Sequence, residues 1–206
     1  RVMYSWKACL VTILALFALK VTNPYFIENI SWSWFDYLHQ TKGEFYVDDI
    51  VLVDIDEKSL ETFGQYPIRR GIYRDLLLDT HHSNTHIFGM LFSKPDRDPT
   101  QDAIFAEGLV NRLTILGAAP TSQTQKGSAP FVGNSTFGGG NPKDFLWNFD
   151  GIVSPIAMLK DNTYGVGVVT ATPAVTGTPN FDGTTRSVPL LVTANDEVYP
   201  SLMLEA

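Results

Sequence analysis

The chain has 206 residues, of which 44% are hydrophobic and 18% are charged, a balance typical of an ordinary folded domain. This composition excludes collagen, a disordered chain and a transporter with many membrane spans. Fifteen basic and 22 acidic residues leave a net charge of −7, so the chain lacks the basic excess that binding a nucleic-acid backbone requires. The single cysteine, Cys9, cannot form an internal disulfide, and its place in an apolar run argues against catalysis.

An apolar run lies near the N-terminus. Residues 8–19 contain only one polar side chain, Thr12, and the basic residues Lys7 and Lys20 flank the run. Twelve helical residues cover about 18 Å of a hydrocarbon core roughly 30 Å thick, so a span must include the flanking residues. No small-residue cleavage site follows the run, so we predict a transmembrane signal anchor over residues 1–22, with a cleaved signal peptide as the alternative. The positive-inside rule then places the rest of the chain outside the cytoplasm.

Aromatic residues, including Trp32 and Trp34, gather in the next segment, residues 23–46. Such rings are typical of a membrane interface, although a core cluster explains them equally well. Residues 1–22 hold three of the 15 basic residues and no acid, so the remainder has 12 basic and 22 acidic residues and a net charge of −10. Because the chain begins with an arginine and ends without a stop signal, we expect it to be a fragment.

Short apolar runs alternate with helical patterns between residues 46 and 118, which predicts βαβ units with parallel strands. Asp56 can cap the first helix and Gly64 can end it. The strands are expected at 50–55, 86–92 and 113–117. Two helices are expected at 57–63 and 70–82, and a third helix follows the polar segment 93–102 and ends at residue 111.

Glycine and proline are concentrated in the second half, since 19 of the 28 fall in residues 117–206. We therefore expect a mobile excursion over 119–143, strands at 166–171 and 185–193, and a helix beginning near residue 199. The predicted fold class is α/β, with a mixed, mainly parallel sheet flanked by helices and a β-rich C-terminal part, preceded by one transmembrane helix. Residues 47–206 would form the outer domain.

Asp54 and Asp56 stand at the carboxyl end of the first predicted strand, where open parallel sheets bind ligands. Two carboxylates can hold a divalent cation, and this Asp-x-Asp resembles the nucleophile motif of the haloacid-dehalogenase-like phosphatases. Such enzymes also need a later acidic pair that completes the metal site, and no convincing one follows residue 110. Helix capping by Asp56 and a solvated Asp54 are the preferred interpretation, and a metal-dependent phosphatase is a minor alternative.

Arg69 and Arg70 stand at a predicted helix start, where a cation is unfavourable to the helix dipole. A carboxylate such as Asp54, Asp56 or Asp182 would compensate them in a structural ion pair. An anionic ligand would do so in a functional site.

Three histidines, His81, His82 and His86, suggest a metal cluster, but the residues between them read as a helix end. A surface turn is the preferred interpretation. The glycine run 138–140 lacks the Lys-Ser/Thr pair of a phosphate loop.

Residues 50–60 and 63–70 together resemble the type-two CHASE domain, an extracytoplasmic sensor of bacterial signalling proteins. The family pattern is roughly I-D-x-x-S-L, a short spacer and G-x-W-P-W-x-R. Residues 181–190, which include Asp182 and Arg186, are similar to its D-G-x-x-R-x-x-P-L stretch. The residues that match the first pattern are Ile55, Asp56, Ser59, Leu60, Gly64, Pro67 and Arg70.

The resemblance implies a non-enzymatic sensory domain outside the cytoplasm, usually followed by further membrane helices and an output domain, which is not in this chain. Together with the apolar N-terminal run, it predicts a single-pass chain in the bacterial inner membrane whose main domain faces the periplasm. A small-molecule ligand and a second copy or other membrane subunits are the expected partners, without cofactor, metal or nucleic acid. Gly89 and Lys94 stand where the family usually has acids, so an accessory subunit of a membrane complex is the alternative. The candidate polar cluster, for ligand binding or structure, is Asp54, Asp56, Ser59, Arg70, Asp182 and Arg186.

Overall fold

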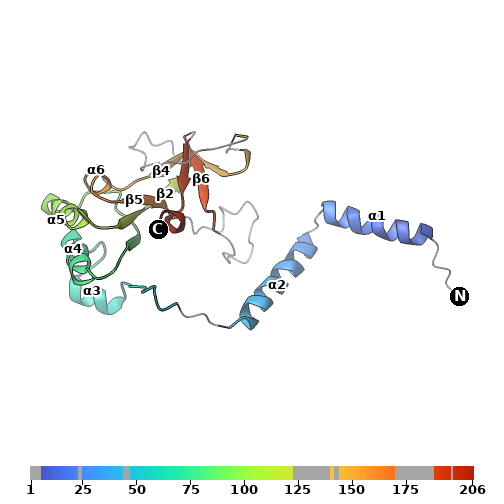
Figure 1. The fold of residues 1–206 in the computed structure, drawn as a ribbon, viewed down its shortest axis with the longest axis horizontal. Helices are drawn as coiled ribbons and strands as arrows, with labels where there is room; N and C mark the ends of the chain where they lie inside the picture. Colours follow the sequence, from blue (N-terminus) through green and yellow to red (C-terminus); the bar gives the residue numbers. More distant parts are fainter. Residues whose placement is uncertain are drawn as a thin grey trace. The chain divides into compact units, whose positions relative to one another are not determined.

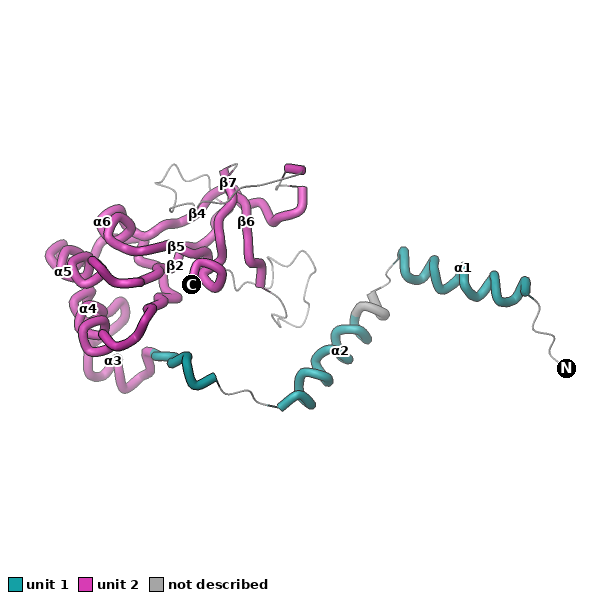
Figure 2. Tube along the Cα trace, viewed as in Figure 1, with its two compact units in different colours: residues 1–54 teal, residues 55–206 magenta. Residues whose placement is uncertain are grey.

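The computed structural model describes residues 6–22, 25–43, 47–122, 140–141, 144–169, 188–195 and 197–206. The chain divides into two compact units, residues 1–54 and residues 55–206 (Figure 2). The domain boundaries expected after residues 22 and 46 stay predictions.

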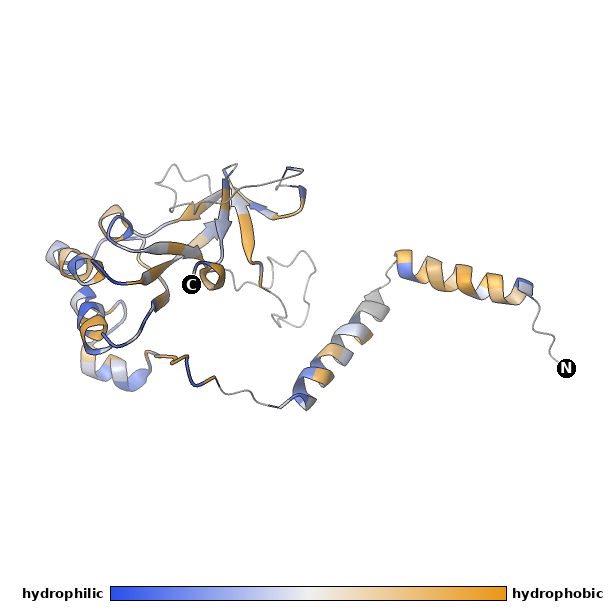
Figure 3. Ribbon diagram, in the orientation of Figure 1, coloured by the Kyte–Doolittle hydropathy of each residue, from blue (hydrophilic) through white to orange (hydrophobic). Residues whose placement is uncertain are grey.

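The first unit contains helices α1 (Trp6–Thr22) and α2 (Tyr25–Thr41). Apolar residues cover α1 along its length (Figure 3), and none of its residues is buried. In α2 the aromatic rings contact one another along the helix surface, since Trp34 stacks on Tyr37 at 5.6 Å and Trp32 meets Phe35 edge-on at 6.0 Å.

The transmembrane helix predicted for residues 1–22 is wrong. Helix α1 has 17 residues, and in the described part of the chain no helix is both long and apolar enough to cross a membrane.

The strand predicted for residues 50–55 is also wrong. Residues 51–56 belong to no helix or strand, and Val51, Leu52 and Val53 expose 83%, 92% and 61% of their surface. A strand needs a hydrogen-bonded neighbour as well as apolar side chains, and this segment joins no ladder. Ile55, by contrast, packs against the core of the second unit.

The second unit begins with helices α3 (Glu57–Phe63) and α4 (Arg70–Asp79), followed by strand β1 (His86–Leu91), helix α5 (Pro99–Leu109) and strand β2 (Thr114–Thr121) (Figure 1). Strands β1 and β2 pair in parallel, with His86 opposite Thr114. The expected βαβ order and parallel pairing are therefore confirmed from β1 through α5 to β2, with boundaries that differ by a few residues. The earlier βαβ unit is not confirmed, because its first strand is absent from residues 50–55.

Strand β2 also pairs in parallel with β5 (Gly165–Val168) and antiparallel with β4 (Gly151–Val153). The short helix α6 (Ala157–Lys160) precedes β5. This first sheet is mixed and mainly parallel, as predicted.

The second sheet has the order β3 (Trp147–Phe149), β6 (Leu191–Ala194), β7 (Glu197–Pro200), and the chain ends in helix α7 (Leu202–Glu205). The predicted strands at 166–171 and 185–193 correspond in part to β5 and β6. The helix predicted near residue 199 begins only at Leu202, because Tyr199 lies in β7, opposite Val192. Most of the excursion predicted over 119–143 lies outside the described residues.

Two clusters of buried side chains form the core. In the first, aromatic rings from α4, β1 and α5 contact one another, among them Tyr73, Phe88 and Phe105 with centroids 5.6 to 5.9 Å apart. Leu116 of β2 and Leu159 of α6 complete it, so these helices cover one face of the first sheet. The second cluster joins the two sheets through residues such as Val166 of β5, Val192 of β6 and Tyr199 of β7.

Candidate ligand-binding site

Asp56 and Ser59 form a helix cap. The Asp56 Oδ1 atom accepts hydrogen bonds of 2.8 Å from both the backbone N–H and the hydroxyl of Ser59, at the N-terminus of α3. These bonds, the backbone bond first, lower the pKa of Asp56 below its usual value. The predicted capping role of Asp56 is confirmed. Asp54 is exposed and belongs to the first unit.

Arg70 is buried at the start of α4, with 7% of its surface exposed. Its Nε atom lies 3.2 Å from Asp102 Oδ1, its Nη2 atom donates a 2.9 Å bond to the carbonyl of Lys94, and its guanidinium lies 4.4 Å from the ring centroid of Phe92. The charge of Arg70 is therefore compensated inside the protein, by a carboxylate other than the three that the sequence suggested.

The loop before α5 completes this network. The carboxylate of Asp96 accepts the backbone N–H of Arg70 at 3.3 Å, and the backbone N–H of Asp96 donates to Asp102 Oδ2 at 2.9 Å. Asp98 caps α5 by accepting from the hydroxyl and the N–H of Thr100, and these bonds lower its pKa. The N-termini of α4 and α5 are thus joined through buried and capping carboxylates.

Asp102 was missed by the sequence reasoning, although a signal was present. Asp102 stands at positions i, i+3, i+4 and i+7 with Phe105, Ala106 and Leu109, and all four side chains are buried. A carboxylate on the apolar stripe of a helix needs a buried cationic partner. That rule predicts a cationic partner for Asp102, and the structure shows that the partner is Arg70.

The six predicted cluster residues are only partly brought together. The structure joins Asp56 to Ser59, and it pairs Arg70 with a different carboxylate. Asp182 and Arg186 lie outside the described residues.

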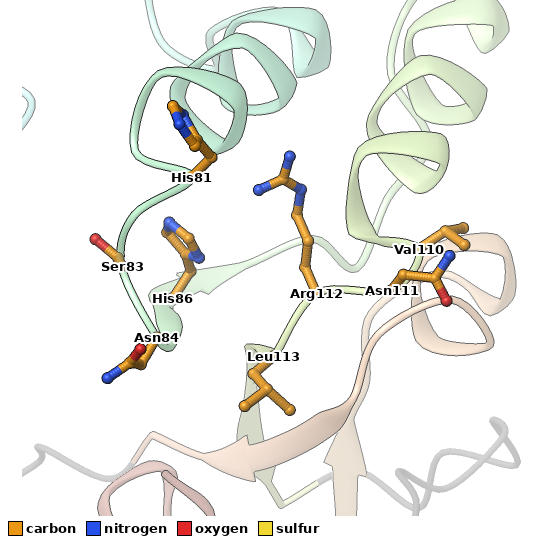
Figure 4. A pocket seen from close by; sticks show the side chains of 8 residues that line it. All are labelled: His81, Ser83, Asn84, His86, Val110, Asn111, Arg112 and Leu113. Atoms are coloured by element: carbon orange, nitrogen blue, oxygen red, sulfur yellow. The ribbon is translucent and has the colours of Figure 1, made fainter.

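A pocket of about 470 Å³ opens where the chain passes from α4 into β1 and from α5 into β2 (Figure 4). Two segments far apart in the sequence line it. They contribute His81, Ser83, Asn84 and His86 from the first loop and strand, and Val110, Asn111, Arg112 and Leu113 from the second.

Hydrogen bonds hold the arginine and histidine side chains of the pocket in place. Arg112 Nη1 donates to the carbonyl of Leu77 at 2.9 Å, and His86 Nε2 lies 2.8 Å from the hydroxyl of Thr80. His81 Nδ1 lies 2.9 Å from the carbonyl of Leu78.

The surface turn expected around the histidines is confirmed for His81 and His82, which are exposed. His86 instead begins β1 and is half-buried. Over the described ranges, no group of three or more His, Cys, Asp or Glu side chains is placed to hold a metal ion.

The family model of the CHASE2 domain matches residues 9–206. The chain belongs to the CHASE2 family. CHASE2 domains are extracytoplasmic sensory domains of signalling proteins, rather than catalytic ones, so the resemblance seen in the sequence motifs is confirmed. Comparisons of this CHASE2 domain with curated proteins and with solved structures give no significant match.

Within the CHASE2 domain, the motif residues Asp56, Ser59 and Arg70 make local and buried contacts of the fold. The pocket beside His86 and Arg112 offers side chains that are open to a ligand. It is therefore the candidate ligand-binding site of the described residues.

Proposed function

We propose that this CHASE2 domain is the periplasmic ligand-binding input of a bacterial inner-membrane signalling protein, and that its ligand binds in the pocket at His86 and Arg112. The observation that carries the proposal is the position of the pocket between two chain segments. Residues 81–86 connect α4 to β1, and residues 110–113 connect α5 to β2.

This position suits a sensor. A ligand shifts a conformational equilibrium only when it contacts the two states differently. A molecule that bridges the two connections would favour the arrangement in which they lie closest, and α4 and α5 would move with them. Contact with a second copy of the domain, or with an output domain, would transmit that change.

A thermal-shift screen of the full chain tests this proposal. The compounds should include organic acids, phosphates, sugars, amino acids, amines and divalent cations. At least one class is expected to raise the Tm as its concentration increases, because a ligand that binds only the folded state stabilises it by mass action.

The shift should disappear in Ser83→Tyr, which puts a bulky side chain on a lining residue of the pocket, and persist in Ser122→Tyr, an exposed serine outside it. A screen in which no class shifts the Tm, or a shift that survives Ser83→Tyr, would overturn the proposal. Stable co-purification with other membrane proteins, without any ligand response, would favour an accessory subunit instead.

A further inference from the structure

We infer that the pocket at His86 and Arg112 recognises the oxyanion of a small molecule, a carboxylate or a phosphate, with Arg112 as the principal contact. The inference rests on the proposed function, since it names the ligand class of the same site.

The lining of the pocket is rich in hydrogen-bond donors and contains no acid. Six of its eight residues have polar side chains, and none of the eight is Asp or Glu. An anionic ligand would therefore meet no like charge on the walls. A cation, by contrast, would find no carboxylate there to balance it.

Most of the N–H groups of Arg112 have no hydrogen-bond acceptor in the described structure. A guanidinium carries five N–H groups, and the described structure occupies one of them, through Nη1, with the carbonyl of Leu77. No described carboxylate pairs with Arg112, whereas Arg70 has Asp102 at 3.2 Å. The half-buried guanidinium of Arg112 is thus a positive charge that the described fold leaves open to an anion.

The C-terminus of α4 lies beside the pocket, and its carbonyls would repel an anion if they were bare. Three of its last four carbonyls accept hydrogen bonds. The carbonyl of Leu76 accepts from the N–H and the hydroxyl of Thr80, that of Leu77 from Arg112, and that of Leu78 from His81 Nδ1. These bonds reduce the negative character of this helix end.

The same bonds assign the histidine protons. The hydroxyl of Thr80 donates its one proton to Leu76 O at 2.6 Å, so it must accept from His86 Nε2. His81 Nδ1 faces a carbonyl and must also carry a proton. In the neutral rings the other nitrogens are acceptors, so the charged donor that the pocket offers to an anion is Arg112.

The guanidinium of Arg112 indicates the chemical class. A guanidinium binds carboxylates and phosphates through two parallel bonds, which no neutral hydroxyl can match. The side chains of Val110 and Leu113 add a small apolar wall. The volume suits a small organic acid or a phosphate ester, because it lies in the lower half of the usual range for ligand pockets.

Isothermal titration of the full chain with inorganic phosphate and with succinate tests the inference, and the two arms distinguish the head groups. At least one anion is expected to bind. Arg112→Gln should weaken it by about tenfold or more, since it removes a charge-assisted hydrogen bond. Arg97→Gln removes the same charge at an exposed position outside the pocket and should leave the affinity unchanged.

Because Arg112 also bonds Leu77 O, the folding of each variant is checked by its Tm. Asn84→Asp gives a second test that leaves that bond in place, and the new carboxylate should weaken anion binding by about tenfold or more. An affinity that is unchanged from the wild type in both Arg112→Gln and Asn84→Asp would overturn the inference. If neither anion binds but a neutral or cationic compound does, and Ser83→Tyr abolishes its binding, the proposed function stands and the inference falls. If no compound class binds, both fall.

Discussion

Arg70 and Asp102 form a buried ion pair, with Arg70 Nε 3.2 Å from Asp102 Oδ1 and side chains 9% and 5% exposed. The pair joins the first turn of α4 to the first turn of α5 across 32 positions of sequence. Arg70, which matches the family motif, therefore has a structural role inside the fold. It holds together two helices whose C-terminal connections line the pocket.

Removing either partner of this pair is expected to destabilise the domain. Arg70→Ala or Asp102→Ala leaves a buried charge unpaired, which costs about 3–5 kcal/mol. Urea unfolding of the full chain measures this loss. Arg69→Ala is the matched control, because Arg69 is exposed, and it should change the free energy of unfolding by less than about 0.5 kcal/mol.

The double variant Arg70→Met/Asp102→Leu should be less destabilised than either single variant, because it leaves no orphaned charge. A normal free energy of unfolding in Arg70→Ala, together with a lost ligand response, would show instead that Arg70 contacts the ligand.

Leu52 and Leu116 show that an apolar residue of this chain is not necessarily a buried one. Leu52 is 92% exposed, and Leu116 is fully buried in the first core. Leu52→Ala should change the free energy of unfolding by less than about 0.5 kcal/mol, whereas Leu116→Ala should lower it by about 2–5 kcal/mol. Chemical denaturation of the two variants measures the difference. Equal losses would mean that residues 50–55 are buried in solution.

The caps at Asp56 and Asp98 predict how stability depends on pH. Their pKa values are lowered in the folded state, by the hydrogen bonds from Ser59 and Thr100. The ionised carboxylates therefore stabilise the fold above the ordinary Asp pKa of about 3.9. That stabilisation should be lost as the pH falls through the lowered values.

Urea unfolding between about pH 5 and pH 2 measures this loss. Asp56→Asn should flatten the curve, because the amide oxygen still accepts but does not titrate. Ser59→Ala removes only the hydroxyl donor and leaves the backbone donor, so it should flatten the curve less. An unchanged curve in Asp56→Asn would contradict the assignment.

The stability of the domain is expected to respond differently to alanine at Gly167 and at Gly89. A Cβ on Gly167 would meet the Cα of Leu202, its N at 2.8 Å and the carbonyl carbon of Ser201 at 3.0 Å, which are backbone atoms that cannot rotate away. Gly167→Ala should therefore lower the free energy of unfolding by about 1–3 kcal/mol.

Gly89→Ala is the control, because a Cβ there meets only the end of the Leu202 side chain, at 4.0 Å. Alanine suits an extended strand better than glycine, so the change should be neutral or stabilising by up to about 1 kcal/mol. Thermal unfolding of both variants compares them. Loss of stability in Gly89→Ala would mean that something unseen packs on that face of β1.

Local patterns in the sequence determined much of the second unit. Asp56 and Gly64 bound α3 as their capping chemistry requires, and the spacing of apolar residues located α4 and β1 to within a few positions. The ordered motifs also led to the family. Such signals lie within a few residues of one another, so one sequence suffices to find them.

Tertiary contacts decided the rest. The sequence contained Arg70 and Asp102, but only the packing of α4 on α5 made them partners. The apolar residues 50–53 satisfied every local rule for a buried strand, and they are exposed because no ladder includes them. The pocket likewise depends on His86 and Arg112 meeting where β1 and β2 begin, 26 positions apart. Pairing, burial and cavities are properties of distant segments brought together, and local periodicity carries no information about which segments meet.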